Sequence, residues 1–255
     1  GPWEIVVWRI VFGFLTAAAI ISFRRDFKQL WVVMKNWQQF KWVIVSTVLI
    51  MVNWQIYVIA IVEHHVIESS LGYFINPLVT IALAVVFLKE KLSRLQWLAV
   101  SFGFLAVIVL TIDYGRLPWL ALSLAFSFAV YGLAKSKLGG QVSAVNSFAL
   151  ESGLLLPVAI VQLWIVSLTP QGITFLTHGF WGAAGLCFYG VMTAVPLILF
   201  GLAAQHLPLK FGGFMQYLTP SIQFVLALTV FHEPMPAVRW IGFGLVWLAL
   251  LLLSS

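Results

Sequence analysis

The chain repeats itself at a fixed offset. The spacing from Pro77 to Pro220 equals the spacing from Trp97 to Trp240, with no gap needed between the two halves. Each proline stands near the middle of an apolar run that is long enough to cross a bilayer, and small or polar residues precede it. Repeated apolar segments that Gly and Pro interrupt at corresponding positions are typical of secondary transporters. The repeat therefore favours a fold built from two related sets of membrane helices.

The composition excludes a soluble protein. Hydrophobic residues make up 62% of the chain and charged residues only 9%, whereas a soluble domain carries about 25% charged residues. The composition predicts an all-α polytopic membrane protein whose surface faces the lipid bilayer. A single cysteine, Cys187, excludes an intrachain disulfide and a cysteine-based metal site. The net charge of +6 does not indicate nucleic-acid binding, because the basic residues stand in short loops between apolar runs.

Nine apolar stretches are each near the ~20 residues that a helix needs to cross hydrocarbon. They are roughly 4–22, 41–62, 67–88, 95–112, 117–134, 144–168, 179–204, 211–231 and 237–254. The connections between them are short, which leaves no room for a soluble domain.

The basic residues alternate between the two sides of these spans. One side holds Arg24, Arg25, Lys28, Lys35, Lys41, Lys89, Lys91, Arg94, Lys135, Lys137 and Lys210. The other side holds only Arg116 and Arg239. By the positive-inside rule the first group faces the cytoplasm, so the C-terminus is predicted to be cytoplasmic in a bacterial inner membrane.

At the same offset that relates Pro77 to Pro220, the span at 117–134 has no partner, because its equivalent would precede residue 1. We therefore expect one further helix before this sequence and two repeats of five helices, 1–115 and 116–255. An odd number of spans in each repeat places the two repeats in opposite orientations, as in an inverted-topology repeat.

The run from Glu63 to Val79, EHHVIESSLGYFINPLV, closely resembles the RarD-type permeases of the EamA branch of the drug/metabolite transporter superfamily. Shorter matches over the whole chain include EIVVWR from Glu4, QWLAV from Gln96 and GFMQY from Gly213. The resemblance implies ten helices in two inverted halves, with both termini in the cytoplasm. It implies a transporter rather than an enzyme, and it implies no cofactor. RarD-type proteins are named for chloramphenicol sensitivity, and the resemblance supplies no natural substrate.

Polar residues form equivalent stripes in the two repeats. Ser69, Tyr73, Asn76 and Thr80 are spaced four, three and four residues apart, and Gly212, Gln216, Thr219 and Gln223 follow the same spacing. Each set lies on one helical face. Pro77 and Pro220 remove a helical hydrogen bond within each stripe, which makes them predicted hinges. We predict that Tyr73, Asn76, Gln216 and Thr219 line a substrate cavity, together with Asn53 and Tyr57. The alternative is that these residues only pack helices together.

Two charged residues, Arg9 and Glu151, lie within apolar runs, where a charge costs ~2.5 kcal/mol or more. Arg9 is predicted to contact the substrate, by receiving an anionic group. Glu151 continues a stripe with Ser143 and Ser147 and is the candidate proton carrier. The alternatives are a static ion pair between Arg9 and Glu151, or an Arg9 side chain that reaches the membrane interface.

A cluster of Glu63, His64, His65 and Glu68 matches no standard zinc spacing and is predicted to consist of solvated loop residues, so no metal site is expected. No phosphate-binding Gly loop is present in the sequence. We therefore predict a secondary transporter, most simply an exporter, that moves small organic molecules by alternating access. A passive channel and an intramembrane enzyme are the alternatives. The pattern predicts no oligomeric state.

Overall fold

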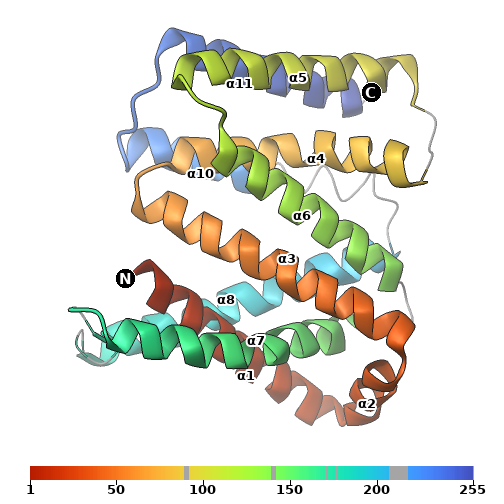
Figure 1. The fold of residues 1–255 in the computed structure, drawn as a ribbon, viewed down its shortest axis with the longest axis vertical. Helices are drawn as coiled ribbons and strands as arrows, with labels where there is room; N and C mark the ends of the chain where they lie inside the picture. The colour runs from red at the N-terminus through yellow and green to blue at the C-terminus, as the bar shows by residue number, and fades with distance from the viewer. Residues whose placement is uncertain are drawn as a thin grey trace. The chain divides into compact units, whose positions relative to one another are not determined.

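The computed structural model describes residues 1–88, 92–138, 142–170, 172–175, 177, 179–206 and 218–254. These residues form ten helices and no strand (Figure 1). The helices are α1 (Pro2–Arg24), α2 (Phe27–Lys35), α3 (Trp37–Val62), α4 (Val66–Leu88), α5 (Arg94–Tyr114), α6 (Trp119–Leu138), α7 (Ala144–Ser167), α8 (Gly179–His206), α10 (Leu218–Thr229) and α11 (Ala237–Ser254). The predicted all-α membrane class is confirmed.

Seven of these helices are long and apolar enough to cross a membrane, and they coincide with seven of the nine predicted spans. They are α1, α3, α4, α5, α6, α7 and α8. The other two predicted spans contain shorter apolar helices, α10 and α11. The predicted span 211–231 begins outside the described residues, and α10 covers its second half.

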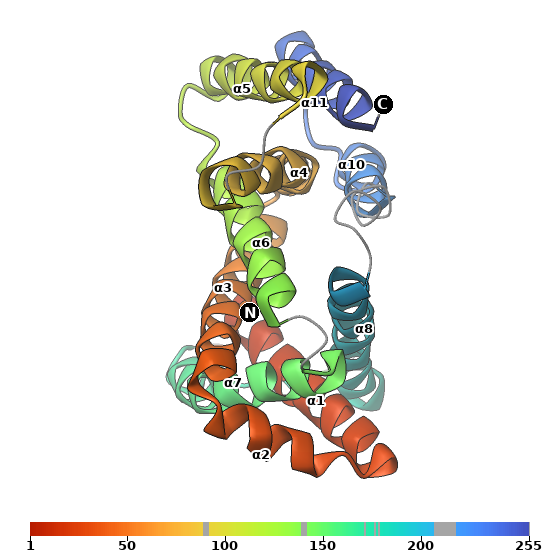
Figure 2. The same ribbon diagram turned by 90° about the vertical axis from the view of Figure 1, so that its right-hand side faces the viewer.

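The sequence did not predict α2, which lies within the predicted cytoplasmic loop between α1 and α3 (Figure 2). Arg25, in the left-handed conformation with φ of 54°, ends α1 and allows the chain to turn. Phe27 and Trp31 of α2 are at least half exposed, whereas Val33 is fully buried. Val33 packs in a small core with Val43, Leu138, Val142 and Leu150.

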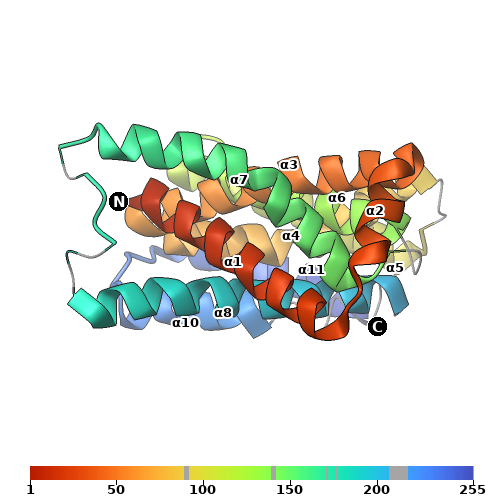
Figure 3. The same cartoon turned by 90° about the horizontal axis from the view of Figure 1, so that it is seen from below.

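The chain divides into two compact units. Unit 1 consists of residues 1–58 and 131–207, and unit 2 of residues 59–130 and 208–255. In unit 1, α1 packs against both α7 and α8 and crosses between them in Figure 3. In unit 2, α5 packs along α11, as Figure 1 shows, and α4 packs against α10.

The offset of the sequence repeat relates α1 to α7, α4 to α10 and α5 to α11. The two members of each of these pairs are in contact within one unit. Each compact unit therefore contains helices from both of the predicted repeats, 1–115 and 116–255. The division into these two repeats stays a prediction.

Small residues allow the helices of unit 2 to approach closely. A side-chain carbon added to Gly242 of α11 would collide with Leu110 of α5, and one added to Gly103 of α5 would collide with Leu78 of α4. Small residues at such crossings are typical of membrane helices. Ser93 begins α5 with a reciprocal capping box to Gln96, which satisfies backbone donors at that helix end.

Candidate functional site

A buried ion pair stands at the centre of the candidate site in unit 1. The Nζ atom of Lys135 on α6 lies 2.6 Å from Oε1 of Glu151 on α7, and both side chains are only 1% exposed. Within the apolar interior such a pair is stable only if its remaining polar atoms are also satisfied.

Hydroxyl groups from three helices complete this pair. Ser46 of α3 donates to Oε1 of Glu151 at 2.5 Å, and Ser147 of α7 donates to the same oxygen at 3.2 Å. Tyr131 of α6 donates to Oε2 at 3.4 Å. Lys135 Nζ also donates to the Ser147 hydroxyl at 2.8 Å. We call these five residues the Lys135–Glu151 network. Both carboxylate oxygens therefore accept hydrogen bonds.

The structure confirms the predicted stripe but changes the partner of Glu151. Ser147 and Glu151 share one helix face and are hydrogen-bonded, as their four-residue spacing predicts. The predicted alternative of an Arg9–Glu151 ion pair is wrong, because Glu151 pairs with Lys135. The charge pattern predicts Lys135 in a cytoplasmic loop. It is buried instead because α6 continues to Leu138, four residues beyond the predicted span.

Arg9 of α1 lies between aromatic rings. Its guanidinium carbon is 4.5 Å from the centre of the Trp54 ring and 5.5 Å from the centre of the Tyr189 ring. The Nε and Nη1 atoms are buried and have no hydrogen-bond partner in the described part of the chain. Among the described residues, no carboxylate forms an ion pair with Arg9. The predicted alternative in which Arg9 reaches the membrane interface does not fit these two buried nitrogens.

The predicted cavity residues are distributed over both units. In unit 1, Asn53 of α3 is buried and Tyr57 is half-buried. In unit 2, Asn76 of α4 is 4% exposed, and the Tyr73 ring meets the edge of Phe128 at 5.9 Å. Thr219 of α10 is exposed, and Gln216 lies outside the described residues. A shared cavity for these side chains therefore stays a prediction.

The two predicted hinge prolines stand within helices. Pro77 is buried in the interior of α4, which continues through it, and Pro220 is the third residue of the described α10. Two further prolines, Pro157 in α7 and Pro196 in α8, also stand inside helices. Neither was predicted as a hinge, because the two do not occupy equivalent positions in the repeat.

In unit 2, two carboxylates accept hydrogen bonds from backbone nitrogens at the N-terminal ends of helices. Glu68 was expected in solvent, but it is buried, pairs with Arg116 at 3.0 Å and accepts a hydrogen bond from the backbone nitrogen of Leu120 near the start of α6. Glu233 accepts hydrogen bonds from the backbone nitrogens of Val66 and Ile67, in the first turn of α4. Carboxylates at helix N-termini satisfy free backbone donors and offset the helix dipole. These contacts are structural.

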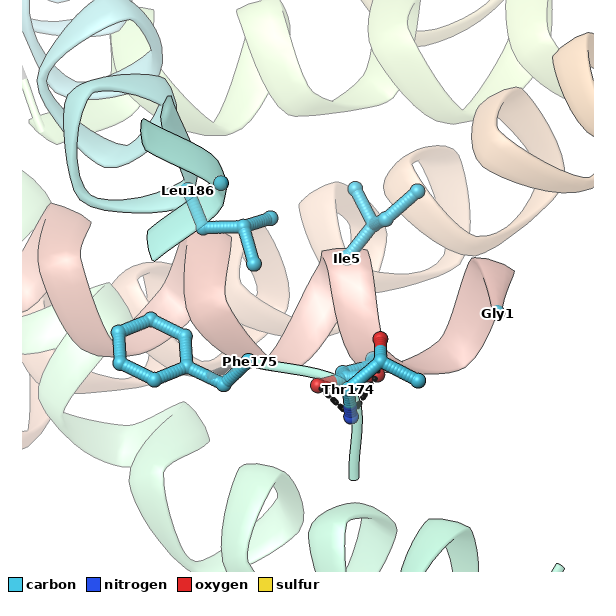
Figure 4. A pocket seen from close by; sticks show the side chains of 7 residues that line it. Gly1, Ile5, Thr174, Phe175 and Leu186 are labelled. Carbon is cyan, nitrogen blue, oxygen red and sulfur yellow. Dashed lines mark hydrogen bonds between the residues drawn. The ribbon is translucent and has the colours of Figure 1, made fainter. Parts of the chain in front are cut away.

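A cavity of about 300 Å³ opens at the start of α1 (Figure 4). Its lining is mostly apolar and includes Ile5, Phe175 and Leu186. The Glu4 carboxylate at its edge accepts hydrogen bonds from the backbone nitrogen and the hydroxyl of Thr174. Because internal donors already occupy this carboxylate, we assign it the role of anchoring the segment after α7 to α1.

Comparison with known proteins identifies the family. The EamA-like transporter family matches residues 1–112. Protein RarD of Streptomyces exfoliatus is 43% identical over 256 residues, which cover 100% of this chain and 80% of that protein. Protein RarD of Escherichia coli strain K12 is 37% identical, with 97% of this chain and 82% of that protein covered. The uncharacterized transporter YojE of Bacillus subtilis strain 168 is 36% identical, with 98% and 84% covered.

These relatives and the apolar helices indicate a multi-pass membrane transporter of a small-molecule substrate rather than an enzyme. The predicted resemblance is confirmed. The chain belongs to the RarD-type permeases of the EamA-like transporter family.

Proposed function

We propose that the protein is a secondary active transporter that exports small organic molecules across the bacterial inner membrane by alternating access. The observation that carries the proposal is the Lys135–Glu151 network, which buries two ionisable groups within membrane helices. Ionisable groups at such positions are costly and mark substrate or proton pathways. Glu151 is the proposed proton carrier, because Ser46 of α3 and Tyr131 and Lys135 of α6 stand on helices other than its own. Movement of α3 or α6 against α7 during a transport cycle would change these contacts.

Transport in proteoliposomes tests this proposal. Purified protein would be screened for counterflow of radiolabelled amino acids, small metabolites and amphenicols, and the solutes that exchange would be tested under an imposed pH gradient. We expect saturable counterflow and net movement that follows the proton gradient. A passive channel would instead give steady conductance in planar bilayers without saturable exchange, and that result would contradict the proposal.

We further propose that Tyr73, Asn76, Gln216 and Thr219 line the substrate cavity in unit 2, with Pro77 and Pro220 as hinges. The contact between α4 and α10 supports this, because it brings the two equivalent helices together. In unit 1, Asn53, Tyr57 and Arg9 are the proposed substrate contacts.

Asn76→Leu is expected to reduce counterflow about tenfold, the equivalent of one lost hydrogen bond of ~1.4 kcal/mol. Its melting temperature should change little, because leucine suits an apolar helix. The matched control is Ser101→Leu, which replaces an exposed polar residue of α5. Equal transport by wild type and Asn76→Leu would remove Asn76 from the substrate site.

The proposed orientation places the loop that contains α2 and the C-terminus in the cytoplasm. Burial of Lys135 removes one cation from the predicted inner side. Ten basic residues remain on that side against two on the other, so the positive-inside argument holds. Lys28→Cys and Ser254→Cys would be introduced separately into a Cys187→Ala background. We expect neither cysteine to react with an impermeant maleimide in intact cells, and labelling of either from outside would contradict the orientation.

A further inference from the structure

The Arg9 site, formed by Arg9, Trp54 and Tyr189 in unit 1, places a cation beside two aromatic rings and leaves two of its nitrogens without an acceptor among the described residues. The two rings lie near the guanidinium carbon, at 4.5 Å and 5.5 Å. Aromatic faces attract a cation through their electron-rich surfaces. The guanidinium N–H bonds point outward in the plane of the group, where hydrogen-bond acceptors are required. Two of its nitrogens, Nε and Nη1, have no such acceptor among the residues that the structure describes.

Unused buried donors are costly. A buried N–H group without an acceptor loses its hydrogen bonds to water and gains none in return, which costs about 1–3 kcal/mol and more for a charged group. The Arg9 side chain as a whole is only half-buried, so part of it is accessible although Nε and Nη1 are covered. A ligand that displaces the groups covering these two nitrogens could supply an acceptor and would gain two charge-assisted hydrogen bonds.

The charge at this site is a single positive one. The other buried cation of unit 1 among the described residues, Lys135, is already paired with Glu151. One negative charge on a ligand would neutralise Arg9, whereas a second would stay uncompensated among apolar residues, which is unfavourable. The adjacent rings of Trp54 and Tyr189 offer apolar surface to the body of such a ligand.

We propose that the Arg9 site binds the carboxylate of a small organic monoanion and that monocarboxylates are the substrate class of this transporter. The assignment of a substrate rests on the proposed transport function, whereas the binding of the carboxylate does not. Binding in detergent and transport in proteoliposomes therefore separate the failure of one from the failure of the other.

The test compares acids with amides of the same shape. Acetate, butyrate and benzoate would be titrated against the purified protein beside acetamide, butyramide and benzamide, with binding measured by thermal shift and equilibrium dialysis. We expect at least one acid to bind more tightly than its amide. Arg9→Gln should weaken that acid about tenfold or more and leave the amide unchanged, because it removes the charge but keeps a polar group.

Further variants separate recognition from stability. Arg24→Gln removes an exposed cation from the end of the same helix and should bind the acid normally. Tyr189→Phe keeps the ring face and should retain binding, whereas Tyr189→Leu should weaken it. Failure of every acid to exceed its amide, or an acid preference that survives Arg9→Gln, would overturn the proposal. Tighter binding of phenyl phosphate than of benzoate would overturn the monoanion assignment. Binding of the acid without counterflow would retain the site and contradict transport.

Discussion

Replacing Glu151 by leucine alone is expected to lower the free energy of unfolding by about 3–5 kcal/mol, because it leaves the buried Lys135 ammonium without its anion. Lys135 is 1% exposed, so water cannot replace the carboxylate. In the same variant Ser46 and Tyr131 would lose the hydrogen bonds that they donate to Glu151, although the Val43 carbonyl remains an acceptor for Ser46. The measurement is reversible unfolding in mixed micelles, with secondary structure as the signal.

The double variant Lys135→Met, Glu151→Leu should recover most of this loss, since two apolar side chains of similar size replace the pair. The two single variants and the double variant form a cycle that isolates the coupling between the two positions. Glu63→Leu, which changes an exposed carboxylate, is the matched control and should have little effect. Additive losses in the double variant would show that the pair does not hold the unit together.

The arrangement of helices follows from patterns that are local in the sequence. Long apolar runs between short polar connections specify where α1, α3 and α4 lie in the sequence. Within the membrane the backbone N–H and C=O groups of each run must hydrogen-bond to one another, which requires a helix. The repeat that relates Pro77 to Pro220 also identifies which helices are equivalent. The contact between α5 and α11 is an example of two equivalent helices that pack together. The short helix α2 was not predicted, because so short a segment with a mixed pattern resembles a loop.

The candidate site was predicted only in part. The spacing of Ser147 and Glu151 placed both on one face of α7, and the contact between them follows from helix geometry alone. Lys135 was missed because a lysine near a helix end is ordinarily solvated, and its burial depends on where α6 ends. Its position four residues after Tyr131, directly after the apolar run 117–134, was the signal that could have identified it. Trp54 and Tyr189 reach Arg9 only through tertiary packing, which one sequence does not specify.

Glu151→Gln is expected to abolish net transport driven by a pH gradient, with a loss of at least about tenfold, while substrate counterflow continues. Glutamine keeps the shape of the side chain and an acceptor for the Ser46 and Ser147 hydroxyls. It cannot take up or release a proton. Counterflow exchanges one substrate molecule for another and needs no net proton movement, so it survives the loss of a proton carrier. The solutes that exchange in the counterflow screen are the probes, and Glu63→Gln is the control.

The same substitution also breaks the ion pair with Lys135, so a loss of transport needs to be separated from a loss of folding. The variant Lys135→Met, Glu151→Gln removes both charges and should be closer to wild type in stability, because no buried cation is left unpaired. If Glu151 carries the proton, this variant folds and exchanges substrate but does not respond to the gradient. If the pair is only structural, restoring stability also restores gradient-driven transport. Transport by the stable neutral variant at the wild-type rate would therefore exclude Glu151 from proton coupling and leave it a purely structural anion.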